Sequence, residues 1–107
     1  MKRIPYWAEL DHNSDDPVTG YQQNRTFMVW PAYRLNDGER YIIGMRSLKN
    51  SMNELCGSSP GFEALRDNIS TNDPAIEGRR NYFEKYIFQP LTQDGVNRQT
   101  LQIAWDF

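Results

Sequence analysis

The Asp37-Gly38 pair constrains the fold of this chain more than any other feature. It lies between two apolar stretches, 25–35 and 40–48. Because glycine accepts the positive φ of a tight turn, this pattern predicts a β-hairpin. With a two-residue loop, the predicted pairs are Leu35 with Arg40, Tyr33 with Ile42, Pro31 with Gly44, and Val29 with Arg46. A longer loop would change this register. Pro31 cannot donate to a ladder, so its strand is expected at a sheet edge.

The two faces of the predicted hairpin differ in character. One face is suited to a core and holds Met28, Trp30, Ala32, Tyr41, Ile43 and Met45. The other face mixes apolar side chains with arginine and holds Val29, Tyr33, Leu35, Ile42, Arg40 and Arg46. We expect the first face to be buried and the second to face solvent or a partner.

Strands are also expected near both ends of the chain. Residues 4–10 alternate loosely between apolar and polar side chains, and Pro5 places this strand at a sheet edge. Residues 101–107 alternate more regularly, which predicts a strand with one apolar face. The side chains of that face are Leu101, Ile103, Trp105 and Phe107.

Three helix starts lie between the hairpin and the last strand. Residues 51–54 match a capping box, and Ser59 and Asp73 each precede a proline, as N-cap residues do. The last helix is expected over 74–88, with Pro90 after its end. Strands grouped before helices predict an α+β fold. Its antiparallel sheet has about four strands (the N-terminal strand, the central hairpin and the C-terminal strand), with two or three helices packed on one face. We expect one compact domain over 1–107.

The composition favours a folded domain. Aromatic residues make up 13% of the 107 residues and the net charge is only −2, whereas disordered chains have few aromatics and high net charge. No stretch approaches the ~18 apolar residues of a membrane span, and the first residues lack the apolar segment of a signal peptide. The single Cys56 excludes an internal disulfide. We therefore expect a cytoplasmic protein without membrane contact.

No residue pattern indicates catalysis or metal binding. Residues 11–15 resemble the first half of a calcium loop, but Asp16 and Gln22 stand where glycine and a bidentate glutamate are required. His12 has no second histidine or cysteine at ligand spacing. Cys56 lies near the end of its expected helix, where the helix dipole disfavours a thiolate. We expect no catalytic residue, metal or cofactor. A small enzyme without a recognisable motif is one alternative.

Positive charge gathers in the middle of the chain. Residues 21–50 carry five basic and two acidic side chains, and several tyrosines lie among them. Arginine and tyrosine can stack on single-stranded bases, so a nucleic-acid-binding protein that uses this hairpin face is another alternative. The overall net charge of −2 is unsuited to a domain that binds by neutralising phosphates.

Protein binding is the function that the sequence favours. Tyrosine and arginine are enriched in interface hot spots, and the second hairpin face mixes them with apolar residues. We therefore expect a small non-enzymatic protein that binds and blocks or modulates another protein. By analogy of size and composition, it is comparable to immunity proteins or phage-encoded blockers of host defence. A homodimer through an edge strand is a further option. The expected partner-binding residues are Tyr33, Leu35, Arg40, Ile42, Arg46, Arg34, Arg79 and Arg80.

Overall fold

Two helices begin at the predicted Ser-Pro and Asp-Pro signals. The computed structural model describes residues 2–11 and 26–107. Helix α1 spans Pro60–Arg66, and the Ser59 hydroxyl accepts a hydrogen bond from the Phe62 amide (3.3 Å). Helix α2 spans Pro74–Phe83, and the Asp73 carboxylate caps it in the same way. Both predicted starts are confirmed, because each cap satisfies an amide that the first turn leaves free.

The second helix continues past its predicted end. Helix α2 runs directly into a π-helical segment, Glu84–Phe88, and then into α3, Gln89–Gln93. Pro90 therefore lies inside the helical rod. In an α-helix, the residue at position 90 would donate its N–H to the Tyr86 carbonyl, and proline has none to donate. A π-helical segment immediately before the proline accommodates this interruption.

The capping-box segment 51–54 forms a turn, so the helix predicted there is wrong. The Asn50 side-chain oxygen accepts hydrogen bonds from the amides of Met52 (2.9 Å) and Glu54 (3.0 Å). Asn53 adopts a left-handed backbone with φ +63°. Asparagine favours turns because its side chain bonds nearby amides and because it tolerates this conformation.

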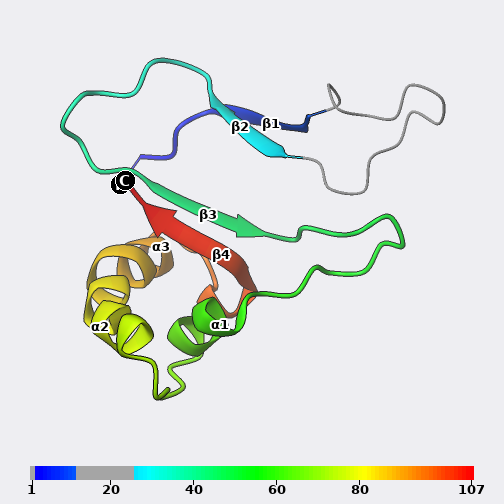
Figure 1. Cartoon of the computed structure of the whole chain (residues 1–107). Helices are drawn as coiled ribbons and strands as arrows, with labels where there is room; N and C mark the ends of the chain where they lie inside the picture. Colours follow the sequence, from blue (N-terminus) through cyan, green and yellow to red (C-terminus); the bar gives the residue numbers. More distant parts are fainter. Residues whose placement is uncertain (1, 12–25) are drawn as a thin grey trace. The chain divides into compact units, whose positions relative to one another are not determined.

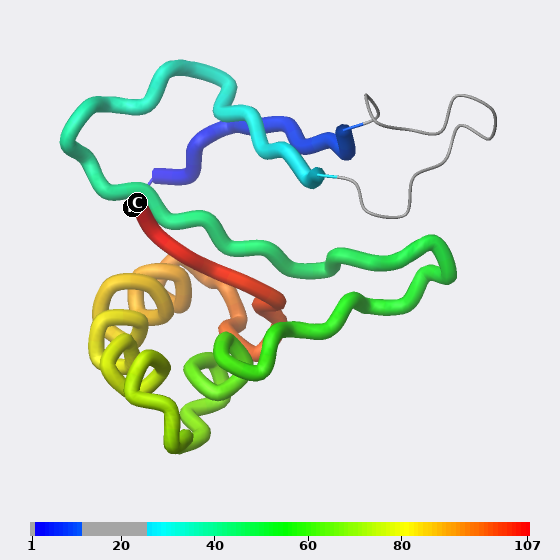
Figure 2. Tube along the Cα trace, viewed as in Figure 1, coloured from blue at the N-terminus to red at the C-terminus, as the bar shows by residue number. Residues whose placement is uncertain are grey.

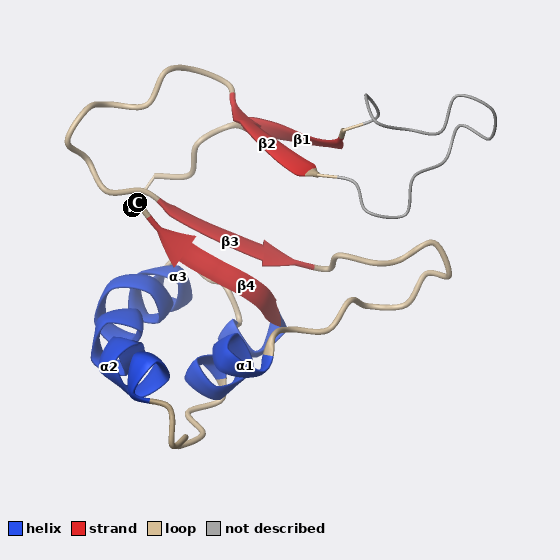
Figure 3. Cartoon of the chain, in the orientation of Figure 1, coloured by secondary structure: helices blue, strands red, loops and turns tan. Residues whose placement is uncertain are grey.

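The strands form two separate two-stranded antiparallel sheets, where the sequence predicts a single sheet (Figures 1 and 3). Strand β1, Tyr6–Leu10, pairs with β2, Phe27–Pro31. Strand β3, Ile42–Arg46, pairs with β4, Leu101–Asp106. A short 3₁₀ turn, Arg98–Thr100, precedes β4. The α+β class is confirmed, and the strand pairing differs from the prediction.

The hairpin predicted around Asp37-Gly38 is wrong in its pairing, although its turn forms. Gly38 has φ +73°, as a tight turn requires. The strands on either side, however, pair with β1 and with β4. The packing around Gly44 on β3 indicates why β3 pairs with β4. A Cβ atom there would lie only 3.1 Å from the Leu101 side chain and 3.4 Å from that of Leu91. Close packing of β3 against distant residues outweighs the local turn signal.

The described chain divides into two compact units, Lys2–Glu39 and Arg40–Phe107. We call them the ribbon unit and the helical unit. Every buried side chain of the described residues belongs to the helical unit: Phe62, Ala64, Leu65, Ile87, Phe88, Leu101 and Ala104. Five half-buried residues pack against this core: Ile42, Ile76, Phe83, Leu91 and Val96. Figure 1 shows α1 and α2 beside β4, where this core forms.

Strand β4 buries a different set of side chains from the one predicted. Leu101 and Ala104 are buried, whereas Ile103 and Trp105 are 41% and 37% exposed. The register shifts at the β3 residue Arg46, where a bulge interrupts the ladder. A bulge of this kind breaks the strict alternation of faces. Leu101 and Ala104 therefore both reach the core.

Three further predictions concern the acidic loop with His12, the thiol of Cys56, and membrane-spanning helices. His12 and nearly all of the acidic loop at 11–16 lie outside the described residues. Cys56 is a free, exposed thiol and does not lie in a helix. In the part of the chain that the structure describes, no helix has the length and apolar character needed to cross a bilayer.

Candidate functional site

The ribbon unit presents two tryptophans from neighbouring strands. Trp7 of β1 lies directly opposite Trp30 of β2, so both side chains share one face of the ribbon. They are 56% and 46% exposed. The Trp30 indole Nε1 donates a hydrogen bond to the Glu9 carboxylate (2.9 Å), which orients the ring. This face therefore holds an oriented aromatic pair beside a carboxylate acceptor.

The opposite face of the ribbon is also apolar. The alternation of side chains along β1 and β2 places on it Tyr6, Ala8, Leu10, Phe27, Val29 and Pro31. Tyr6 is 67% exposed. None of the residues described between positions 2 and 39 is buried. A two-stranded ribbon alone is marginally stable at best, so these faces gain stability when another surface covers them.

The residue pattern does not predict that Trp7 and Trp30 form an exposed pair. Trp30 is predicted on the buried face of a central hairpin, and that prediction is wrong because the hairpin does not form. For Trp7, the sequence does contain a signal. In the alternation of residues 4–10, Trp7 occupies a position between the apolar ones, where a polar side chain is expected. A large aromatic ring at a solvent-facing position indicates a contact surface.

Three of the predicted partner-binding residues follow β2 in the ribbon unit. Tyr33 is 46% exposed, and the Lys2 ammonium lies 5.9 Å from its ring centre. Arg34 forms an exposed ion pair with Asp37 (3.3 Å), which contributes little to stability. Leu35 is half-buried. Tyr33 thus adds another exposed aromatic ring to the ribbon unit, while Arg34 already has a carboxylate partner.

Arg40 stabilises the helical unit to which it belongs. Its guanidinium donates hydrogen bonds to the Tyr86 carbonyl (2.6 Å) and to Asp106 (3.2 Å). It also lies 5.1 Å from the Tyr86 ring centre, a cation–π distance. The Tyr86 carbonyl is the one that Pro90 leaves without an α-helical donor. Arg40 supplies a donor to that carbonyl. The hairpin face on which Arg40 is predicted does not form, and its part in partner binding stays a prediction.

Tyr82 completes the cluster around Arg40. Its hydroxyl donates a short hydrogen bond to Asp106, and its ring centre lies 4.9 Å from that of Tyr86. The pKa of Tyr82 is raised above its ordinary value, mainly because of the hydrogen bond to Asp106. The cluster therefore links the segment that precedes β3, the end of β4 and the helical rod.

The two predicted residues on β3 have different environments. Ile42 is half-buried against the helical core. Arg46 is exposed beside the bulge. The single face that should join Ile42 to Tyr33 does not form, because the strands on either side of the predicted turn belong to different sheets.

Arg79 and Arg80 also differ, although they are adjacent. Arg80 donates to the Ala64 carbonyl near the end of α1 (3.1 Å) and forms an ion pair with Glu77 (2.7 Å). The hydrogen bond from Arg80, followed by one from Thr71, lowers the pKa of Glu77 to about 2. Arg79 is exposed. Of the two, Arg79 is the one that is exposed, whereas the Arg80 side chain is largely covered.

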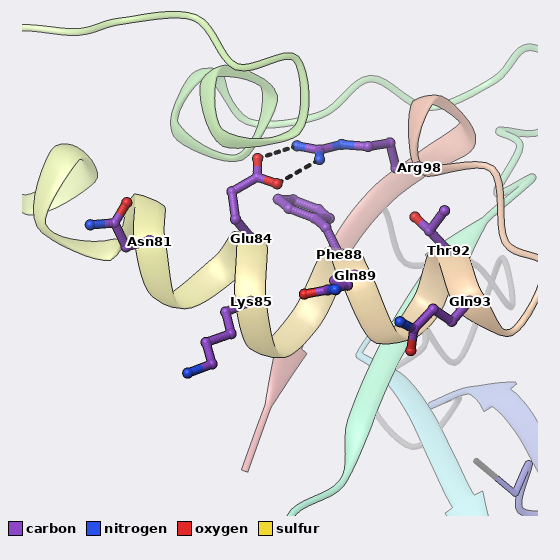
Figure 4. A pocket seen from close by; sticks show the side chains of 8 residues that line it. All are labelled: Asn81, Glu84, Lys85, Phe88, Gln89, Thr92, Gln93 and Arg98. Atoms are coloured by element: carbon purple, nitrogen blue, oxygen red, sulfur yellow. Dashed lines mark hydrogen bonds and ion pairs between the residues drawn. The ribbon is translucent and has the colours of Figure 1, made fainter.

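Arg98 is a structural residue that no sequence motif identifies. It donates to the carbonyls of Leu65 (3.0 Å) and Arg66 (2.9 Å), which lie at the end of α1. It also forms two hydrogen bonds with Glu84, at 2.7 and 2.8 Å (Figure 4), and these lower the pKa of that carboxyl. Its guanidinium lies 4.2 Å from the Phe88 ring centre. Arg98 therefore satisfies carbonyls that a helix end leaves open.

A depression of about 510 Å³ lies beside this ion pair (Figure 4). Its polar side chains include Asn81, Lys85, Gln89 and Gln93. Glu84 and Arg98 form an ion pair there. Within residues 2–11 and 26–107, no group of three or more His, Cys, Asp or Glu side chains could hold a metal ion.

Comparisons of the chain with family models, curated proteins and solved structures found no match. The functional assignment therefore depends on the geometry of the chain itself. Of the surfaces described, the ribbon combines two paired tryptophans with an oriented acceptor. We take this ribbon as the candidate functional site.

Proposed function

We propose that this protein is non-enzymatic and that it binds and blocks or modulates another protein through its ribbon unit. The observation that carries the proposal is the exposed Trp7–Trp30 pair, which lies on a unit with no buried described residue. Tryptophan, tyrosine and arginine dominate the hot spots of protein interfaces. Glu9, already bonded to the Trp30 indole, supplies a directional acceptor at the edge of the pair.

The tryptophan pair can supply a large part of the binding free energy. A buried aromatic side chain covers roughly 150–250 Å². Covering the exposed part of each indole contributes about 2–3 kcal/mol at ~25 cal/mol per Å². A micromolar complex needs about 8 kcal/mol in total, after the costs of association. Tyr6 and Tyr33, also exposed, provide further area toward that total.

The charges of the ribbon favour a protein partner over a nucleic acid. Sites for single-stranded nucleic acid combine stacking rings with free cations along the phosphate path. Here a carboxylate, Glu9, adjoins Trp30, and Arg34 is paired with Asp37. The complementary partner is a protein surface with an apolar hollow for the two indoles. An N–H group or a cation at the rim of that hollow would bond to the lone pairs of the Glu9 carboxylate that the Trp30 indole leaves free.

Affinity purification followed by direct titration tests this proposal. The wild-type chain, Trp30→Ala and Ile69→Ala serve as baits in an extract of the producing cells. Ile69 is a matched control, because it is 52% exposed but lies in the helical unit. We expect a partner that is retained by the wild type and by Ile69→Ala and lost by Trp30→Ala. Calorimetry with the purified partner should show at least ~10-fold weaker binding for Trp30→Ala.

Two outcomes would contradict the proposal. One is a purified partner that binds Trp30→Ala and Trp7→Ala as tightly as the wild type. The other is tight, salt-sensitive binding of a single-stranded oligonucleotide by the wild-type chain, which would favour nucleic acid as the ligand.

A further inference from the structure

A short hairpin projects from the helical unit between β3 and α1 (Figure 2). We call residues 48–56 the tip hairpin. At its base, the Cys56 amide donates to the Leu48 carbonyl (2.9 Å). At its tip, the Asn50 amide donates to the Glu54 carbonyl (2.9 Å), and the Asn50 side chain closes the turn. The backbone is therefore hydrogen-bonded from base to tip.

One side chain of β4 fixes both arms of the tip hairpin. Gln102 donates from Nε2 to the carbonyls of Leu48 (2.9 Å) and Cys56 (2.6 Å). Its Oε1 accepts from the Leu48 amide (2.8 Å). The hairpin is thus anchored to the sheet and held in one conformation. A loop ordered in advance loses little conformational entropy when it binds.

The tip hairpin exposes apolar side chains and one unpaired acid. Met52 is 77% exposed and Leu55 is 66% exposed. Among the described residues, no hydrogen bond or ion pair involves the Glu54 carboxylate. A membrane is a poor match for this tip, since Lys49 and Glu54 cancel in charge and leave no attraction to anionic lipid. Two apolar side chains on a rigid support are better suited to a protein groove.

The same unit carries an apolar groove of about 350 Å³ along α1, α2 and β4. Its apolar lining includes Phe62, Leu65, Ile76, Phe83, Ile103 and Trp105. The charged residue that lines it is Arg79, which is exposed. Within the described part of the chain, the Arg79 guanidinium has no hydrogen-bond or ion-pair partner. The groove therefore offers an apolar surface and one available cation.

We propose that the tip hairpin of one copy of this chain inserts Met52 and Leu55 into the groove of a second copy. Apolar side chains then meet an apolar groove, and Glu54 pairs with Arg79. Glu54 is the acid of the hairpin, and Arg79 is the charged residue that lines the groove. Every copy carries both a hairpin and a groove, so in the proposed dimer the two copies exchange hairpins around a two-fold axis and make the contact twice.

Sedimentation velocity of the full chain tests the dimer, over concentrations from about 1 to about 500 µM, which bracket a weak association. We expect a reversible monomer–dimer equilibrium. Met52→Asp should raise the dimer dissociation constant at least ~10-fold, because it places a charge in the apolar groove. Ile69→Asp is the matched control, since Ile69 is exposed but lines neither the hairpin nor the groove. It should leave the constant unchanged, as should Trp30→Ala in the ribbon.

A charge exchange tests the pairing itself. Glu54→Arg should raise the dimer dissociation constant about 5-fold, because Arg79 repels the new charge. The double variant Glu54→Arg, Arg79→Glu should bring the constant back to within about 2-fold of the wild-type value. Circular dichroism of each variant verifies that it is folded. A monomer at every concentration, a dimer insensitive to Met52→Asp, or a double variant without recovery would overturn the proposal. The ribbon takes no part in this contact, so such a result leaves the proposed function standing.

Discussion

The ribbon unit and the helical unit contain aromatic residues in similar abundance, but among the described residues only the helical unit buries any of them. In the helical unit, Phe62 and Phe88 are 7% and 1% exposed and lie in contact at the centre of the core. In the ribbon unit, Trp7 and Trp30 are about half exposed. The number of aromatic residues therefore does not tell whether a region is a core or a contact surface. The surrounding side chains decide this.

The arginines show the same contrast. In the helical unit, Arg80 and Arg98 bond to carbonyls at the end of α1 and to Glu77 and Glu84. In the ribbon unit, Arg34 makes one exposed pair with its neighbour Asp37. One unit is thus stabilised by long-range contacts, and the other by its own ladder and local pairs.

Removal of a core ring should produce the largest loss of stability. Phe88→Ala should lower the free energy of unfolding by about 3–5 kcal/mol, because Phe88 is 1% exposed and its loss leaves a cavity. Trp7→Ala removes a larger ring but should cost less than about 1 kcal/mol, because that ring is 56% exposed. Urea unfolding followed by circular dichroism measures both. Equal losses would refute the proposed difference between the units.

Removal of the Arg98 charge should have the next largest effect. Arg98→Met keeps much of the apolar stem but leaves Glu84 and two helix carbonyls without their donor, so we expect a loss of about 2–3 kcal/mol. Arg46→Met is the matched control, since Arg46 is exposed. It should change the free energy of unfolding by less than about 0.5 kcal/mol. A similar result for both variants would mean that the Arg98 contacts contribute nothing.

Lowering the pH should show how much the Glu77–Arg80 ion pair contributes to the free energy of unfolding. The pKa of Glu77 is about 2 in the folded chain, against an ordinary value of 4.5. Its contribution to stability is therefore present above pH 4.5 and is lost as the pH falls toward 2. Glu77→Gln should flatten the dependence of the urea midpoint on pH over this range. Part of the slope should remain, because the pKa values of Asp67 and Glu84 are lowered as well. An unchanged slope would contradict the ion pair.

The smallest effect should follow loss of the Glu9 carboxylate. Glu9→Ala removes an exposed hydrogen bond to Trp30, so the free energy of unfolding should change by less than about 0.5 kcal/mol. Exchange of the Trp30 indole proton, measured by NMR, should nevertheless become faster. If Glu9→Ala destabilises the chain as much as Arg98→Met, the ribbon is more tightly integrated than we propose.

Some local signals in the sequence predict local structure correctly, although the capping box at 51–54 and the helix end expected before Pro90 do not. The caps at Ser59 and Asp73 begin helices, and Gly38 forms a turn. Pro31 lies on an edge strand, as predicted, because each strand of a two-stranded sheet is an edge. These features depend on a few neighbouring residues, so the sequence alone contains what determines them.

Contacts between distant residues are not predictable in the same way. The turn at Gly38 does not determine which strands pair, because the alternation of side chains is equally compatible with several partners. The Gln102 contacts with the tip hairpin and the Arg98 contacts with α1 depend on tertiary placement. The exposed position of Trp30 is not predictable from the sequence for the same reason, because the pattern pairs its strand with β3 and the structure pairs it with β1.

The contact between Arg40 and the Tyr86 carbonyl has a consequence for how this sequence can change during evolution. Pro90 removes the amide that would otherwise bond to that carbonyl, and Arg40 replaces it. A descendant that exchanges Pro90 for another residue regains an amide that can bond to the Tyr86 carbonyl, so that contact of Arg40 becomes less important. A descendant that loses Arg40 alone loses the guanidinium that now bonds to this carbonyl. Positions 40 and 90 should therefore change together as the sequence diverges, although neither side chain bonds to the other.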